Sequence, residues 1–296
     1  MSALILNGIE VSIQIEQKLK EKIIKLKQKN IIPGLAVILV GDDKPSQTYV
    51  NLKHKKCEEL GIFSKIYKFD ENIEEQEIIN LIQTLNNDDK INGILLQLPL
   101  PKKFDVSKIT DAISYLKDVD GFHPLNFGYL ALNRPLFIPC TPYGVIKLLE
   151  HYKINVTGKN AVIVGCSNIV GKPMGLLLQF CETATCTICH ILTKNLKEKT
   201  REAEILISAA GKPNLITADM VKENAIVIDI GFNVTECQDN KGNIIRKVCG
   251  DVDFENVKNI AQAITPVPGG VGPMTITMLM YNTIKSAELS ASAGAE

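Results

Sequence analysis

The chain has 296 residues, enough for two domains of ordinary size that each bury a core. Its 33 basic and 33 acidic residues give a formal net charge of zero, which argues against a nucleic-acid partner, because such binding rests on clustered cations. The sequence contains no window of 18 apolar residues and no basic start followed by a long apolar run. We therefore expect a cytoplasmic protein with no membrane partner.

Apolar runs of strand length alternate with amphipathic runs of helical length through the first half of the chain. Ser46 is a suitable N-cap for one predicted helix, and Gly61 suits the position after its last turn. This alternation predicts a parallel sheet covered by helices. The predicted strands are residues 35–41, 62–69 and 91–101, the last of them broken by Pro99 and Pro101. The predicted helices are residues 47–60 and 73–86.

A proline-rich hinge at residues 134–144 separates this pattern from a second one. Strands again alternate with helices there, around the stretch VIVGCSNIVGKP at residues 162–173. We predict an α/β protein of two domains, of which the second is a Rossmann-type dinucleotide-binding domain. Its predicted strands are residues 160–165, 184–191, 204–210, 225–231 and 247–253, and the predicted helices are residues 144–152, 172–180 and about 274–290.

The stretch at residues 162–173 departs from the dinucleotide fingerprint G-x-G-x-x-G. Gly165 occupies the first glycine position, but Ser167 and Val170 occupy the second and third, and Gly171 follows one residue late. Pro173 suits the first turn of the following helix, where a missing N–H costs little. The loop has the right place for a nucleotide site but not the usual glycines.

Polar residues of the first half are candidates for chemistry. Tyr49 and Lys53 are four residues apart on a predicted helix and share a face, to which Lys56 also belongs by spacing. A lysine that faces an apolar sheet is desolvated, so its pKa falls and it can transfer protons near neutral pH. Gln97 ends a predicted strand, where open α/β sheets place ligand groups. Spacing alone also fits a surface lysine and a structural glutamine.

Two polar stretches raise the question of a metal or haem site. Asp118, Asp120 and His123 share a turn, but no further cluster of carboxylates or histidines supports a metal, and we expect none. The stretch CTICH at residues 186–190 matches the pattern of haem attachment. It reads as a strand, however, in which residues three apart point to opposite faces, so we expect no haem.

A loop rich in glycine and proline, TPVPGGVGPMT, spans residues 265–275. Its prolines make it rigid, and its glycines let a flat ligand approach the backbone closely. The combination indicates a ligand contact.

Taken in order, these motifs resemble the bifunctional methylenetetrahydrofolate dehydrogenase/methenyltetrahydrofolate cyclohydrolase family. The resemblance covers about residues 3–288 and rests on the ordered set SQTYVNLKHKKCEELGI, GILLQLPLP, KDVDGFHP, PCTP, VIVGCSNIVGKPM, AAGKPNLI, VIDIGFN, GDVDF and ITPVPGGVGPMT. It implies a folate-binding catalytic domain at residues 1–140, completed by the helix at about 274–290. It also implies an NAD(P)-binding domain at residues 141–273, with a cleft between the two domains.

The resemblance implies two reactions of one-carbon metabolism. Hydride transfer from 5,10-methylenetetrahydrofolate to NADP would give the 5,10-methenyl cation, which water would convert to 10-formyltetrahydrofolate. Lys53 would transfer protons in the hydrolysis, with Gln97 holding it. Tyr49 would orient the folate, and Asp120 would bind the pterin edge. Further implied folate contacts are Leu98, Pro99, Pro268, Gly269, Gly270, Val271, Gly272, Pro273, Met274, Thr275 and Ile276. Implied cofactor contacts are Thr141, Gly165, Cys166, Ser167, Val170, Gly171, Pro173, His190, Ile191, Ala210, Gly211 and Phe232.

The identity of the cofactor depends on a few positions. NAD-binding Rossmann domains usually carry Asp or Glu about 20 residues after the first glycine, and none ends the predicted strand 184–191, which favours NADP. Many family members, however, carry arginine in place of Cys166, and serine or arginine in place of Ile191. Lys172, Lys194 or a backbone N–H could replace these phosphate donors. We predict NADP and keep NAD as the alternative.

Two other functions fit parts of this pattern. A monofunctional NAD-dependent dehydrogenase would not need Lys53 and Gln97, and both are present. A non-catalytic nucleotide-binding protein would need none of Tyr49, Lys53, Gln97 and Asp120. The resemblance also implies a homodimer formed through the Rossmann-type domain.

Overall fold

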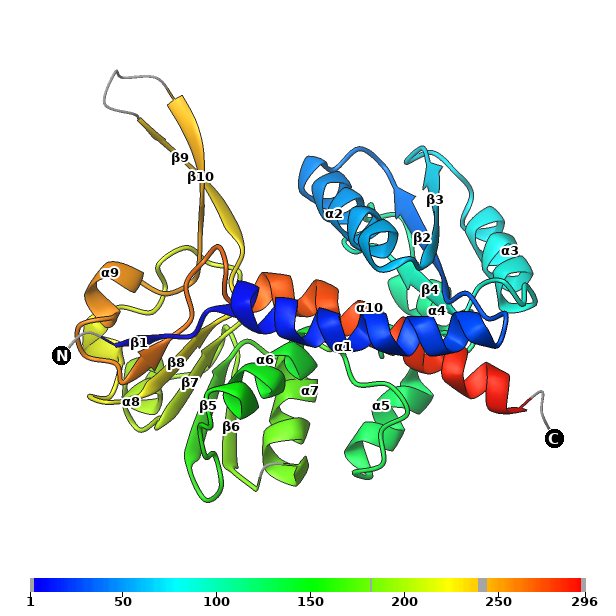
Figure 1. Ribbon diagram of the computed structural model, residues 1–296. Helices are drawn as coiled ribbons and strands as arrows, with labels where there is room; N and C mark the ends of the chain where they lie inside the picture. The colour runs from blue at the N-terminus through cyan, green and yellow to red at the C-terminus, as the bar shows by residue number, and fades with distance from the viewer. Residues whose placement is uncertain (1–2, 182, 239–243, 294–296) are drawn as a thin grey trace. The chain divides into compact units, whose positions relative to one another are not determined.

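The computed structural model describes residues 3–181, 183–238 and 244–293, and the chain forms two compact units within it (Figure 1). The three-stranded unit contains Ile13–Cys140 and the chain from Ile276 onward. The six-stranded unit contains Thr141–Thr275 and the chain up to Ser12. The chain passes from one unit to the other within helices α1 (Gly8–Gln28) and α10 (Val271–Ala293) and at the start of α6 (Cys140–His151).

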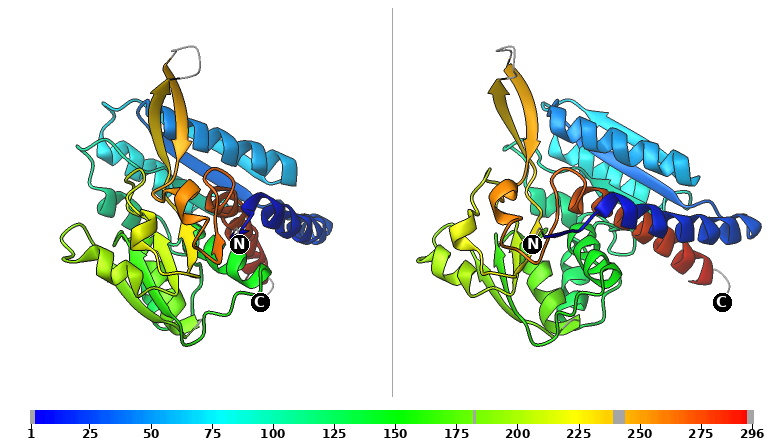
Figure 2. Two further views of the ribbon diagram at one scale, coloured as in Figure 1. Left: turned by 90° about the vertical axis from the view of Figure 1, so that its left-hand side faces the viewer. Right: turned by 60° about the vertical axis from the view of Figure 1, so that its left-hand side comes forward.

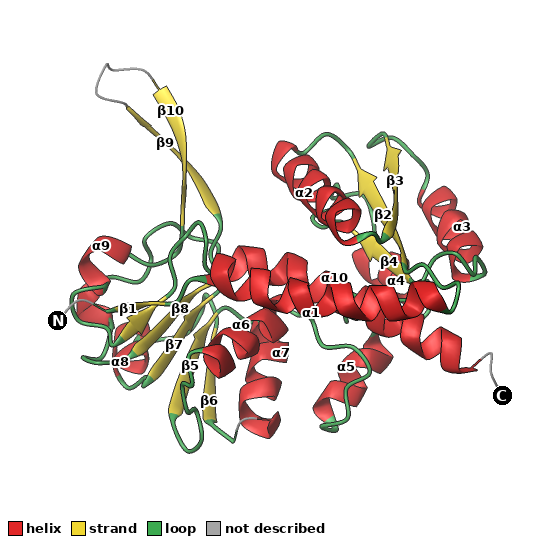
Figure 3. Ribbon diagram, in the orientation of Figure 1, coloured by secondary structure: helices red, strands yellow, loops and turns green. Residues whose placement is uncertain are grey.

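A parallel sheet forms the centre of the three-stranded unit. The middle strand β2 (Gly34–Val40) pairs in parallel with β3 (Phe63–Phe69) and with β4 (Gly93–Leu96). Every residue of β2 is buried, as expected for a continuous apolar run covered on both faces. Figure 3 shows helix α2 (Lys44–Leu60) on one side of this sheet and α3 (Glu75–Asn86) on the other. The predicted parallel sheet is confirmed.

Two details of this unit differ from the prediction. Strand β4 runs from Gly93 to Leu96 and is shorter than the predicted 91–101. The Gln97 N–H still donates to the Ile38 carbonyl at 2.9 Å, and Pro99 and Pro101, where the strand is predicted to break, have no N–H to donate. Helix α2 begins at Lys44, and its N-cap is Asp43, not Ser46. The Asp43 carboxylate accepts hydrogen bonds from the Ser46 N–H at 2.9 Å and the Ser46 hydroxyl at 2.7 Å. The end of the helix is as predicted, since Gly61 has a φ of 80°.

The six-stranded unit contains a sheet in which all neighbouring strands are parallel. Its order is β1-β11-β8-β7-β5-β6. Numbered along the chain, β5, β6, β7, β8 and β11 therefore stand in the doubly wound order 2-1-3-4-5. The central strands β7 and β8 are buried at every position. The strands are β1 (Leu4–Ile5), β5 (Asn160–Val164), β6 (Thr185–Cys189), β7 (Ile205–Ser208), β8 (Ile226–Asp229) and β11 (Ala263–Ile264).

The membership of this sheet differs from the prediction at two places. Residues 247–253 were predicted to join it, but β10 (Ile244–Cys249) pairs antiparallel with β9 (Asn233–Gln238) in a separate hairpin. Figure 2 shows that the hairpin extends away from the sheet in both views. The sheet is completed instead by β11 and by β1, which pairs with β11 near the start of the chain. Residues 3–12 therefore belong to the six-stranded unit and not, as expected, to the first domain.

The remaining helices are short and connect the strands. Within the described residues, none of the helices is long and apolar enough to cross a membrane. The short helices are α4 (Val106–Asp111), α5 (Pro124–Ala131), α7 (Gly171–Leu176), α8 (Leu196–Arg201) and α9 (Phe254–Val257), with a π-helical turn at Leu177–Cys181 and a 3₁₀ turn at Ala218–Met220.

Candidate functional site

Helix α2 places Lys53 against the sheet of the three-stranded unit. The side chain belongs to the buried face of the helix, together with Val50 and Cys57, and Lys53 is only 8 % exposed. Burial lowers the pKa of the Lys53 ammonium, and the nearby Asp120 carboxylate offsets only part of this effect. Of the two environments that its spacing allows, Lys53 therefore has the buried, desolvated one and is not a surface lysine.

Gln97 fixes the position of the Lys53 amine. The Lys53 Nζ donates a hydrogen bond of 2.9 Å to the Gln97 Oε1. The Gln97 Nε2 donates in turn to the Leu98 carbonyl at 2.6 Å, which orients the amide with its oxygen toward the lysine. Gln97 directly follows β4, so the strand and α2 together set the geometry of the pair.

Asp120 is the acidic partner of this centre. Burial raises the pKa of its carboxyl to about 6, even though the Lys53 ammonium acts to lower it. The turn that carries Asp120 is held by the buried carboxylate of Asp118, which accepts the backbone N–H groups of Phe122 and His123. Asp118 thus stabilises a turn. Among the residues that the structure describes, no three His, Cys, Asp or Glu side chains are grouped to hold a metal ion.

Tyr49 lies one helical turn before Lys53, as its spacing predicts. It is partly buried, and burial raises the pKa of its phenol to about 12, so it stays neutral in the physiological range. Lys56 does not share the site. Its ammonium pairs with Glu16 at 2.9 Å and with Glu59 at 2.8 Å.

Cys140 is a member of this centre that the sequence analysis missed. Its thiol is buried, and burial, strengthened by the negative Asp120 beside it, raises its pKa well above the ordinary value. The thiol also donates to the Val119 carbonyl, and the Asn282 amide donates to that carbonyl at 2.8 Å. The motif PCTP contained the only signal, and it was interpreted as part of a hinge.

The predicted nucleotide loop lies at the end of β5 in the six-stranded unit. Gly165 has a φ of 125°, and a Cβ at this position would lie 2.3 Å from the Ala209 carbonyl oxygen, so only glycine fits. Gly171 is equally constrained, because its Cβ would lie 2.0 Å from the Gly165 carbonyl oxygen. The Ser167 hydroxyl accepts the Val170 N–H at 3.1 Å and closes the loop, while Cys166 is exposed. The two glycines and the serine form a compact turn with accessible backbone.

Other predicted cofactor residues lie at the ends of neighbouring strands in this unit. Gly165, His190 and Ala210 follow β5, β6 and β7, the three strands on that side of the sheet. Carboxyl ends of parallel strands are where open α/β sheets bind ligands. Ile191 is fully exposed and Phe232 is 43 % exposed. Thr141 is the second residue of α6, and its hydroxyl lies 3.0 Å from that of Thr275.

The glycine-proline loop belongs to the six-stranded unit up to Thr275. Gly269 has a φ of 101°, and its carbonyl accepts the N–H of Gly8 at 2.9 Å. A Cβ on Gly8 would lie 1.8 Å from the Gly270 carbonyl oxygen, so the start of α1 packs directly on the loop. These close backbone contacts make the loop rigid.

A glycine-turned loop on a parallel six-stranded sheet and a desolvated lysine in a second α/β unit define a two-domain protein of the dinucleotide-binding class. The sequence profile of the tetrahydrofolate dehydrogenase/cyclohydrolase catalytic domain matches residues 6–120, and that of the NAD(P)-binding domain matches residues 139–291. The chain belongs to the tetrahydrofolate dehydrogenase/cyclohydrolase family.

Individual relatives agree over nearly the whole chain. The bifunctional protein FolD of Bacillus cytotoxicus is 50 % identical over 288 residues, which are 97 % of this chain and 98 % of the relative. The crystal structure of the FolD dehydrogenase/cyclohydrolase from Campylobacter jejuni is 51 % identical, with a TM-score of 0.91 over 98 % of this chain and all of the other. The FolD enzyme of Trypanosoma brucei, solved with NADP and an inhibitor, is 33 % identical, with a TM-score of 0.93 over 98 % of this chain and 99 % of the other.

Proposed function

We propose that the protein oxidises 5,10-methylenetetrahydrofolate to the 5,10-methenyl form with NADP and hydrolyses that product to 10-formyltetrahydrofolate. The observation that carries the proposal is the buried Lys53, whose amine is bonded to Gln97 beside Asp120. Hydride transfer alone needs no proton-transfer group, whereas hydrolysis does. This centre therefore supports the bifunctional function over a monofunctional dehydrogenase, as does the 50 % identity to bifunctional FolD proteins.

The side chains of the three-stranded unit suit the hydrolysis. In its neutral form, which the lowered pKa favours, the Lys53 amine takes a proton from the water that attacks the methenyl carbon. Gln97 holds the amine, and its own bond to the Leu98 carbonyl prevents the amide from turning its N–H₂ toward the lysine. An ionised Asp120 accepts N–H donors of the pterin ring, and Tyr49 orients that ring. Leu98 and Pro99 complete the folate contacts of this unit.

The six-stranded unit suits the dinucleotide. Bound NADP supplies the acceptor for the hydride. The turn of Gly165, Ser167 and Gly171 would bring the backbone close to the pyrophosphate, because only glycine fits at residues 165 and 171. The choice of NADP over NAD rests on the missing acid after β6 and on the NADP complex of the Trypanosoma brucei relative. Comparing kcat/KM for the two nucleotides tests this choice, and an NAD preference contradicts it.

Substitution of Lys53 by Met tests the proposed function. We expect the decay of methenyltetrahydrofolate to slow at least about 100-fold, because a positioned proton-transfer group contributes this much or more. Lys55→Met is the matched control, since Lys55 is an exposed lysine on the same helix, and its decay rate should equal that of wild type. If the Lys53 variant hydrolyses methenyltetrahydrofolate as fast as wild type, at a rate above that in buffer alone, the proposed role of Lys53 is contradicted.

We also propose that the protein acts in the cytoplasm as a homodimer formed through the six-stranded unit. The edge strand β6 supports this, since Ile188 on it and Phe180 before it are both more than one-third exposed. Light scattering should give twice the chain mass of 32.6 kDa.

A further inference from the structure

Asp251 is a fully buried carboxylate in the six-stranded unit, two residues after the hairpin strand β10. It accepts hydrogen bonds from five neutral donors, three on Oδ2 and two on Oδ1. The partners are the Ser208 hydroxyl (3.1 Å) and the N–H groups of Ala210 (2.7 Å) and Gly211 (3.1 Å) on Oδ2, and the Lys212 N–H (2.9 Å) and the Asn233 amide (2.9 Å) on Oδ1. A carboxylate with five donors is saturated as an acceptor.

Three of these donors, the N–H groups of Ala210, Gly211 and Lys212, lie in one loop. Ser208 is the last residue of the strand before this loop, and Asn233 is the first residue of β9, at the end of a second loop. Residues 209–212 follow β7, and residues 230–233 follow β8, which is the neighbouring parallel strand. Both loops leave the carboxyl end of the sheet, and they carry Ala210, Gly211 and Phe232, which we propose as cofactor contacts. One buried side chain therefore joins the two loops that would contact the cofactor on this side of the sheet.

The surroundings hold Asp251 in place. A Cβ on Gly231 would lie 2.2 Å from the Asp251 Oδ1, so the second loop packs directly on the carboxylate. The buried Asp229 accepts the N–H groups of Gly231 (2.9 Å), Asp251 (3.0 Å) and Val252 (2.9 Å). The Asp229 N–H donates to the Thr265 hydroxyl at 2.7 Å, where the glycine-proline loop begins. Hydrogen bonds thus hold both the backbone and the side chain of Asp251 in place.

We propose that Asp251 is the positioning residue that sets the shape of loops 209–212 and 230–233 for binding the dinucleotide. The inference rests on the proposed function. An ionised carboxylate suits this task because it carries no proton and can accept from every direction. An asparagine of the same shape would turn an N–H₂ group toward two or three donors, so that at least one loop would move away.

Asp251→Asn tests the proposal, with Asp253→Asn as the matched control. Asp253 is two residues away, and its carboxylate accepts the Asn256 amide at the start of the short helix α9. For Asp251→Asn we expect the Kd and KM for NADP to rise roughly tenfold or more, since a buried donor is left without its partner. Hydrolysis of methenyltetrahydrofolate, measured without nucleotide, should stay within about twofold of wild type, because Lys53 and Gln97 belong to the three-stranded unit and Asp251 to the other. A general loss of folded protein would instead lower both activities equally.

Unchanged affinity for NADP in a folded Asp251→Asn protein overturns the proposal, as does an equal loss of both activities. If this variant does not fold, Ser208→Ala removes a single donor, and we expect a roughly two- to fivefold weaker Kd for NADP. Wild-type affinity in Ser208→Ala and in Asn233→Ala would then overturn it. Failure of the wild-type protein to bind NADP would instead contradict the proposed function.

Discussion

At the scale of the residue, the proton-transfer chemistry of Lys53 depends on the residues around it. Lys53 and Tyr49 were recognised from their spacing on a helix, because four residues make one turn. The depth of burial that lowers the Lys53 pKa depends on the sheet beneath the helix, which spacing does not reveal. Cys140 could not be found from its motif, because it meets Asp120 only when segments 20 residues apart fold together.

Asp120 leads to a prediction about pH. Its pKa of about 6 means that the carboxylate loses its charge as the pH falls through 6, and with it the ability to accept from the pterin. From pH 8 to pH 5 the ionised fraction falls about tenfold, so we expect the Kd for a tetrahydrofolate to rise about tenfold. Titration calorimetry at several pH values measures this.

Asp120→Asn serves as the control for this experiment. The variant should bind the folate weakly at every pH, because it lacks the titrating group. An equally steep pH dependence in the variant would show that another group titrates.

At the scale of the element, helix α2 shows how local sequence places a side chain. Its C-terminal glycine was recognised correctly, but its N-cap was placed three residues too late. Asp43 and Ser46 are both good capping residues, and they bond to each other, so sequence alone does not rank them. Asp43 is the N-cap because its carboxylate accepts hydrogen bonds from both the N–H and the hydroxyl of Ser46.

Asp43→Ala should therefore lower the free energy of unfolding by about 1 kcal/mol, through loss of the cap. Urea denaturation followed by circular dichroism measures the change. The adjacent Asp42→Ala is the control, because the Asp42 side chain accepts an exposed 3.3 Å hydrogen bond from the Gln47 amide and does not cap the helix. Its effect should stay below about 0.5 kcal/mol. Equal losses in the two variants would contradict the role of Asp43 as the cap.

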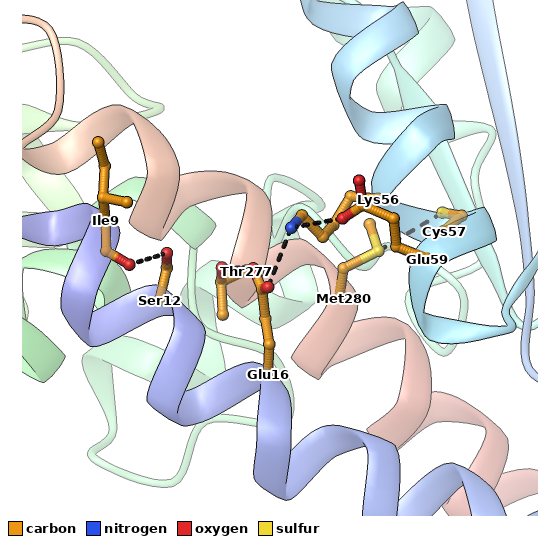
Figure 4. A network of polar contacts seen from close by, with 8 residues as sticks. All are labelled: Ile9, Ser12, Glu16, Lys56, Cys57, Glu59, Thr277 and Met280. Atoms are coloured by element: carbon orange, nitrogen blue, oxygen red, sulfur yellow. Dashed lines mark hydrogen bonds and ion pairs between the residues drawn. The ribbon is translucent and has the colours of Figure 1, made fainter.

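At the scale of the whole molecule, contacts between distant segments hold the helices of the three-stranded unit. Figure 4 shows Glu16 of α1 between Lys56 of α2 and Thr277 of α10. Glu16 is nearly buried, and it receives the Lys56 ammonium at 2.9 Å and the Thr277 hydroxyl at 2.8 Å. Its partners lie 40 and 261 residues away in the sequence. A single carboxylate thus connects three helices.

Glu16→Gln should lower the free energy of unfolding by roughly 1–3 kcal/mol, because an amide N–H₂ would face the Lys56 ammonium in a buried place. Glu59→Gln removes the other carboxylate that pairs with Lys56, but Glu59 is exposed, so we expect a loss below about 0.5 kcal/mol. Urea midpoints of the two variants can be compared directly. A larger loss for Glu59→Gln would contradict the central place of Glu16.

Most strands were predictable from sequence because their signal is local: a run such as GLAVILV is buried wherever it lies. The family, the parallel sheets and the lysine helix followed from such runs and motifs. The two-residue strands β1 and β11 carry too little sequence to be recognised, and only their pairing across the chain makes them strands. The same holds for the β9–β10 hairpin, for Cys140 beside Asp120 and for the five donors of Asp251. Each of these features depends on contacts between segments that are far apart in the sequence. Such contacts form only in the folded chain, which is why the sequence alone does not predict them.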